Sequence, residues 1–120
     1  MNRGIITISE SGLVTMPSAP TWMSLQEIAD MLGVFECYVR KAITAIFKDG
    51  ILKEYDVRQH VKQDNRISYD VYNLEIIISV AFRIDSIESR AFREFTMQAI
   101  IQKTNNRPKL VCLWTKDAMA

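Results

Sequence analysis

The chain has 120 residues, of which 48% are hydrophobic and 24% charged, and its formal net charge is +1. This length supports one domain with a hydrophobic core and is too short for two ordinary domains. The longest apolar run, residues 76–82, is far shorter than the ~20 residues that cross a bilayer, and residues 1–4 lead into no signal-peptide core. We therefore expect a soluble, cytoplasmic protein, with a net charge too small to indicate nucleic-acid binding by itself.

Residue types that carry catalysis or metal binding are sparse. Cys37 and Cys112 lie far apart without Cys-x-x-Cys spacing, and His60 is the only histidine, so we expect no metal site and no other cofactor. A reducing cytosol favours free thiols over a disulfide between them. The sequence has no Gly-rich phosphate loop and no nucleophile elbow, and His60 lies on a predicted strand without partner groups. We expect a protein that is not an enzyme.

Residues 1–19 predict an N-terminal β-hairpin. Two short β-favouring runs, residues 5–8 and 13–16, are separated by the turn-forming sequence Ser-Glu-Ser-Gly. A hairpin of this size is marginal alone, so it requires support from the rest of the chain.

Residues 22–50 have the pattern of a helix-turn-helix. Ser24 and Glu27 have the spacing of a capping box, which predicts that a helix begins at Ser24 and ends at Gly33. A second helix is predicted from Phe35 to Lys48, with Gly50 ending it. The apolar residues that recur at helical spacing, and that we expect to face inward, are Leu25, Ile28, Ala29 and Leu32 in the first helix and Val39, Ala42, Ile43, Ile46 and Phe47 in the second.

The second half of the chain predicts a hairpin followed by two helices. Residues 55–72 contain two β-favouring runs around the polar tip 63–66, an arrangement typical of a wing. Within residues 73–104, Asn73 is a good N-cap for a helix over 74–83, and a fourth helix begins near Ser86 or Ser89. Residues 105–120 are predicted as a tail, with one last strand over 110–114. The side chains of the fourth helix that we expect to face inward are Phe92, Phe95, Thr96, Ala99 and Ile100.

These elements predict an α+β fold, a single winged helix-turn-helix-like domain over residues 1–120 with short hairpins and about four helices. DNA is the partner that this fold suggests, because the second helix places polar and basic side chains on the side opposite its apolar stripe. Residues 21–56 nevertheless carry four basic and six acidic side chains, so positive charge must come from elsewhere. The residues that we expect to contact duplex DNA are Tyr38, Arg40, Lys41, Thr44 and Lys48 on the second helix and Arg58, Lys62 and Arg66 on the wing.

A protein-interaction module without DNA binding is the alternative. Met97 and Ile101 fall on the outer face of the fourth helix, and Met31 lies off the inner stripe of the first. Exposed apolar side chains of this kind suggest a homodimer interface, unless residues 110–114 fold back over them. The sequence leaves both possibilities open.

The residues also resemble a known family. The segment Trp22-Met23-Ser24-Leu25-Gln26-Glu27-Ile28-Ala29-Asp30-Met31-Leu32-Gly33-Val34, then Lys48-Asp49-Gly50, and above all the stretch "YNLEIIISVAFRI" at 72–84 with Phe92-Arg93 resemble the N-terminal region of the RhuM family of bacterial virulence-associated proteins. The resemblance covers roughly residues 22–100. It implies a DNA-binding-like domain, in a transcriptional regulator encoded on a mobile element, and it implies no catalytic residues.

Overall fold

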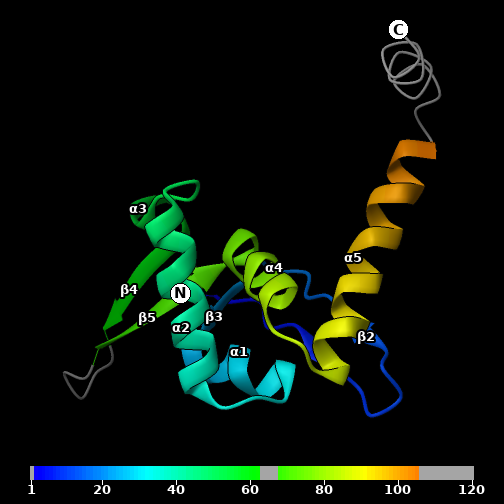
Figure 1. Cartoon of the computed structure of the whole chain (residues 1–120), viewed down its shortest axis with the longest axis horizontal. Helices are drawn as coiled ribbons and strands as arrows, with labels where there is room; N and C mark the ends of the chain where they lie inside the picture. Colours follow the sequence, from blue (N-terminus) through cyan, green and yellow to red (C-terminus); the bar gives the residue numbers. More distant parts are fainter. Residues whose placement is uncertain (1, 63–67, 106–120) are drawn as a thin grey trace, which may run out of the picture.

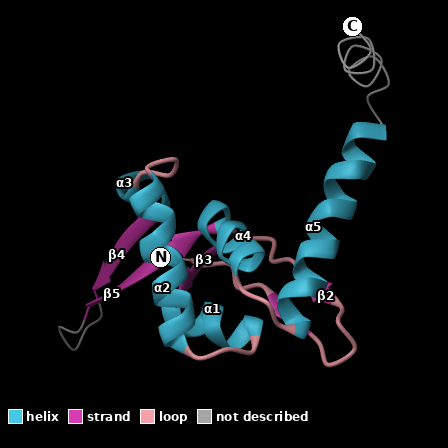
Figure 2. Cartoon of the chain, viewed as in Figure 1, coloured by secondary structure: helices cyan, strands magenta, loops and turns pink. Residues whose placement is uncertain are grey.

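The computed structural model describes residues 2–62 and 68–105. Within those residues it is an α+β structure with five helices and two small antiparallel sheets (Figures 1 and 2). The predicted fold class is therefore confirmed at this level. The prediction of about four helices missed one short helix, described below.

The N-terminal hairpin is present and is shorter than predicted. Strand β1 (Thr7–Ile8) pairs antiparallel with β2 (Val14–Thr15). Ile6 and Val14 are buried in the main core, and helix α5 (Ile87–Asn105) packs against both strands. The hairpin therefore gains the support that a two-stranded ribbon needs.

Strand β3 (Trp22–Ser24) leads directly into helix α1 (Leu25–Leu32). The predicted capping box is confirmed, because the Glu27 amide donates to the Ser24 hydroxyl (3.3 Å) and the Ser24 amide donates to the Glu27 carboxylate (2.7 Å). Gly33 ends the helix at a φ of +67°, a conformation that favours glycine. Strand β3 was not predicted, since only its pairing with a distant strand defines it.

Helix α2 (Glu36–Asp49) packs against α1 and against helix α4 (Leu74–Arg83). Gly50 ends it at a φ of +76°. The prediction that Met31 lies off the inner face of α1 is wrong: Met31 is only 7% exposed. Helix α1 contacts α2, α5 and the sheet, so its buried face is wider than a single stripe. The predicted inward residues of α2 are confirmed as buried at Val39, Ala42, Ile43 and Ile46, with Phe47 partly buried.

The predicted wing is a hairpin within a three-stranded sheet. A short helix α3 (Glu54–Val57), which was not predicted, precedes β4 (Arg58–Lys62), and β5 (Ser68–Asn73) pairs with β4 on one side and β3 on the other. The predicted tip, residues 63–66, lies outside the described residues.

Two helices complete the chain that the structure describes. Helix α4 (Leu74–Arg83) begins as predicted at Asn73, whose side-chain oxygen accepts from the Ile76 amide (3.3 Å). Helix α5 (Ile87–Asn105) begins after Ser86, and the buried Ser89 hydroxyl donates to the Ile84 carbonyl oxygen (2.7 Å).

The predicted inner face of α5 is only partly correct. Phe92 is buried and Thr96 partly buried, but Phe95, Ala99 and Ile100 are exposed. The reason is visible in Figure 1, where the second half of α5 extends beyond the body of the molecule. The predicted strand at 110–114 and Cys112 lie outside the described residues. Among residues 2–62 and 68–105, no helix combines the length and apolar character needed to span a membrane.

Candidate nucleic-acid interface

The outward side of α2 carries the residues predicted to contact DNA. The opposite side of the helix packs on α1 and α4, and helical periodicity then places the polar side chains on the surface. All five predicted α2 residues are exposed, as is the free thiol of Cys37; the five are Tyr38, Arg40, Lys41, Thr44 and Lys48. The Thr44 hydroxyl donates to the Arg40 carbonyl oxygen (2.9 Å), a bond within the helix.

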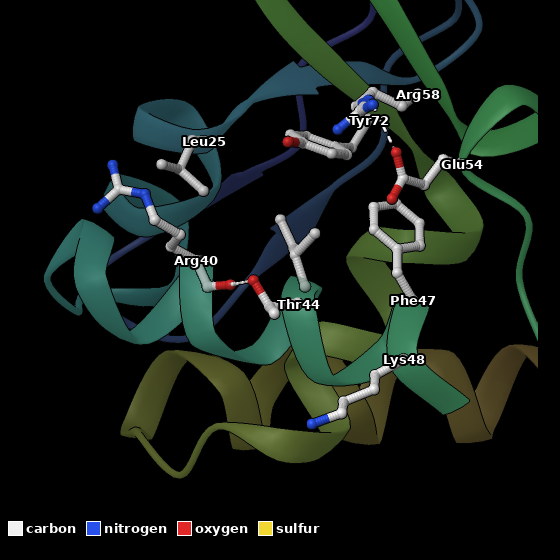
Figure 3. Close-up of a pocket in the computed structure, with 9 residues that line it drawn as sticks. Leu25, Arg40, Thr44, Phe47, Lys48, Glu54, Arg58 and Tyr72 are labelled. Atoms are coloured by element: carbon white, nitrogen blue, oxygen red, sulfur yellow. Dashed lines mark hydrogen bonds and ion pairs between the residues drawn. The ribbon is translucent and has the colours of Figure 1, made fainter. Parts of the chain in front are cut away.

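An open groove of about 600 Å³ separates α2 from the sheet and from α3 (Figure 3). We call it the α2–sheet groove. It brings Arg40, Thr44 and Lys48 of α2 together with Arg58 of the wing, which are four of the eight predicted residues. Its remaining lining residues are Leu25, Ile43, Phe47, Glu54 and Tyr72.

The two arginines of this groove have carboxylate partners. The Arg58 guanidinium lies 2.5 Å from Glu54 and 4.0 Å from Asp70, and 5.9 Å from the centre of the Phe47 ring. The Arg40 guanidinium lies 3.8 Å from Glu36. Because these charges are partly neutralised within the protein, their pull on an anion is weaker than two free arginines would give.

The lysines differ from the arginines. Among the described residues, Lys41, Lys48 and Lys62 have no carboxylate oxygen within 4.0 Å. In Figure 3 the Lys48 amino group points away from the sheet, whereas Arg58 lies over Tyr72 and close to Glu54. Within the described part of the chain, no carboxylate therefore holds the lysines of α2.

Tyr38 and Lys41 lie on the other flank of α2. With Arg83, Ile84 and Asp85 they line a second open hollow of about 520 Å³, which we call the α2–α4 hollow and which Val34 and Ala42 complete. Hydrogen bonds and charge attraction from Arg90 hold the pKa of Asp85 below its usual range, with a smaller contribution from Arg93. The predicted contact residues are thus divided between two flanks of one helix.

Among the described residues of the β4–β5 hairpin, only Arg58 of the predicted contact residues lines one of these two hollows. Lys62, at the end of β4, is exposed and lines neither the α2–sheet groove nor the α2–α4 hollow. Arg66 lies outside the described residues. His60 forms a cross-strand contact with Asp70, its Nδ1 lying 2.7 Å from the carboxylate.

An acidic surface adjoins the first turn of α2 on the sheet side. Glu27, Asp30, Glu36 and Asp70 line one depression there, together with Arg3 and with Arg40, which also lines the α2–sheet groove. Burial acts to raise the pKa of Glu27, but hydrogen bonds from Arg3 and from the Ser24 amide outweigh it and hold the pKa below its usual range. Sequence reasoning missed Arg3, because nothing in the local pattern connects it to a residue 24 positions away. With four carboxylates against two arginines, the charge of this depression is unfavourable for a phosphate.

No group of three or more His, Cys, Asp or Glu side chains that could hold a metal ion occurs in the described part of the chain. Comparison of the chain with known protein families, with curated protein sequences and with solved structures gave no match. The resemblance to the RhuM family therefore stays a prediction, and the function must be argued from the surface.

Proposed function

We propose that this protein binds duplex DNA through α2, assisted by the β4–β5 hairpin. The observation that carries the proposal is that Lys41 and Lys48 lie on the outward side of α2 without carboxylate partners in the described residues. They are seven residues apart, about two helical turns, so they project in nearly the same direction from α2, with Lys41 lining the α2–α4 hollow and Lys48 the α2–sheet groove. A row of unpaired cations on a helix suits the phosphates that border a groove.

The topology supports a winged helix-turn-helix arrangement. Helix α1, a short turn at Gly33 and helix α2 are followed by the β4–β5 hairpin, and the strand before α1 pairs with β5. A reading helix requires one face packed on the preceding helix and the other open to the groove, and α2 meets both requirements.

The ion pairs of Arg40 and Arg58 set an expectation about the affinity for DNA. Arg40 and Arg58 would exchange a carboxylate partner for a phosphate, which gains less than pairing a free cation. We therefore expect modest, strongly salt-dependent affinity from one copy of the domain, with Lys41 and Lys48 making the largest contribution among the residues of α2.

The test is a fluorescence-anisotropy titration with random-sequence duplex DNA at several salt concentrations. Lys41→Ala with Lys48→Ala should weaken binding and reduce the slope of log K against log salt by about two, since each lost phosphate contact removes about 0.9. Lys103→Ala removes an exposed lysine from α5 and should leave the slope unchanged. Absence of binding at low salt, or equal slopes in all variants, would refute the proposal.

Self-association through α5 is a second candidate function, favoured by a separate observation. Met97 and Ile101 are 49% and 45% exposed on the half of α5 that extends beyond the body. Within the described residues these side chains are not covered, and a helical segment of this length gains stability in water by packing on an apolar face. We propose a homodimer, which would also double the number of phosphate contacts.

Sedimentation tests the dimer. Met97→Asp should give a monomer at concentrations where the parent chain sediments as a dimer, whereas Gln98→Asp, which adds the same charge at a neighbouring exposed position, should not. Identical sedimentation of the parent and the Met97 variant would remove this proposal and leave DNA binding untouched.

A further inference from the structure

Two aromatic side chains at the start of α2 have no structural explanation in the described part of the chain. Phe35 is 78% exposed and Tyr38, one turn later, is 55% exposed. Phe35 occupies the N-cap position, where its side chain makes no capping hydrogen bond. Serine, threonine, aspartate or asparagine at this position would stabilise the helix better. The aromatic residue therefore gives up a stabilising cap and gains no burial in return.

The neighbours of this pair fit a negatively charged partner with an apolar surface. Tyr38 and Lys41 line the same hollow as Arg83 and Asp85. Asp85 is paired with Arg90 and Arg93, and Arg83 with Asp49, whereas Lys41 has no carboxylate within 4.0 Å among the described residues. A cation next to exposed aromatic rings is unsuited to a purely hydrophobic partner. It matches a DNA groove, where phosphates border the exposed edges of the bases.

The side chains present on α2 restrict what could be read in that groove. Residues 36–49 contain no asparagine and no glutamine, so the bidentate pairing with adenine is not available from this helix. Arginine and lysine are the side chains suited to guanine; Arg40 lies on the opposite flank beside Glu36, and we assign Lys41 to phosphate. Apolar contact with the 5-methyl group of thymine is the readout that Phe35 and Tyr38 can supply.

We propose that Phe35 and Tyr38 are specificity-determining residues that contact thymine methyl groups in the major groove, giving the protein a preference for T·A pairs at these positions. This inference rests on the proposed DNA binding by α2. It assigns the base contacts to the aromatic pair and leaves phosphate contacts to the lysines. Burial of one methyl group corresponds to about a fourfold gain in affinity.

The experiment begins by selecting preferred sites for the full chain from a random duplex library. Each thymine of a selected site is then replaced by uracil, which removes only the methyl group, and affinity is measured by anisotropy. At one or two positions uracil should weaken binding by about fourfold. Phe35→Ser and Tyr38→Ser should each abolish the thymine-to-uracil difference at one of those positions, and Phe35→Ser should leave thermal stability equal or higher because serine is a better N-cap.

Two controls separate this inference from the proposed function. Tyr55→Ser removes an aromatic ring that is 80% exposed on α3, beyond the C-terminal end of α2, and should keep the full thymine-to-uracil difference. Lys41→Ala should weaken thymine and uracil duplexes equally. If the parent chain binds both duplexes equally well, the inference is overturned while DNA binding stands. If it binds no duplex, both are overturned.

Discussion

Replacement of Glu27 by alanine tests the contact that joins the N-terminal segment to the first helix of the candidate interface. The Glu27 carboxylate accepts hydrogen bonds from the Arg3 guanidinium at 2.6 and 3.3 Å and from the Ser24 amide at 2.7 Å. A charge-assisted hydrogen bond contributes about 1.5–3 kcal/mol when buried. The Glu27 side chain is 31% exposed, so we take roughly half of that value for the Arg3 pair.

The capping contact adds to this loss. The reciprocal half of a capping box and the favourable position of a carboxylate in the first helical turn together contribute about 0.5–1 kcal/mol. Glu27→Ala should therefore lower the free energy of unfolding by about 2 kcal/mol, which for a domain of this size lowers Tm by about 8 °C. Urea denaturation followed by circular dichroism measures the change. Glu10→Ala, which removes an exposed carboxylate from the β1–β2 turn, should change stability by less than about 0.5 kcal/mol.

The loss of stability in Glu27→Ala should also depend on pH. Because the pKa of Glu27 is lower in the folded state than in the unfolded state, its stabilising contribution is fully present above the unfolded value and is lost as the pH falls through the folded one. The difference between the parent chain and Glu27→Ala should be largest near neutral pH and should shrink as the pH falls below the usual range of a glutamate. A difference that is absent at pH 7, or unchanged between pH 7 and pH 2, would refute the assigned contacts.

Three further substitutions test the packing by urea denaturation. Phe92→Ala should cost about 3–5 kcal/mol, because the ring is 1% exposed in the main core; a cost below 1 kcal/mol would mean that the ring is not packed there. Gly4→Ala should cost about 2–3 kcal/mol, since a Cβ atom there would lie 2.4 Å from the Ala19 carbonyl oxygen. Gly50→Ala should cost only about 1 kcal/mol, because φ is +76° but no atom lies within 4 Å of the added Cβ; equal costs for the two glycine variants would contradict this packing.

The parts of the fold that sequence could predict are those with local signals. The Ser24–Glu27 capping box, the Asn73 N-cap and the glycines at 33 and 50 each place a helix end within one or two residues, and all four are confirmed. These signals act over fewer than five residues, so no tertiary information is needed to use them.

The parts that could not be predicted depend on distant contacts. Strand β3 has three residues and is defined by pairing with β5, some 47 to 51 positions later along the chain. The inner face of α5 was predicted as continuous because its apolar residues recur along the whole helix, whereas only its first half packs on α4, α1 and the hairpin. Periodicity reports which side chains share a face, and it cannot report where the body of the molecule ends.

For the candidate site, too, the features with local signals could be predicted and those that depend on distant contacts could not. Helical periodicity correctly predicted that Lys41, Thr44 and Lys48 face outward. It could not predict that Arg40 and Tyr38 would border different hollows, because that depends on the sheet and α4 lying on opposite flanks of α2. Nor could it predict the ion pairs of Arg58, which join side chains from α3, β4 and β5.

The junctions between the three-stranded sheet and its helices contain no connecting loop. Ser24 is both the last residue of β3 and the N-cap of α1, and Asn73 is both the last residue of β5 and the N-cap of α4. Strands β3 and β5 are paired, with Trp22 opposite Asn73, and β4 pairs with the other edge of β5. A displacement of β4 is therefore transmitted through the sheet to both helices, because no flexible loop lies between. The sheet, α1 and α4 should therefore move together, and we expect their amide hydrogens to exchange as a single cooperative unit.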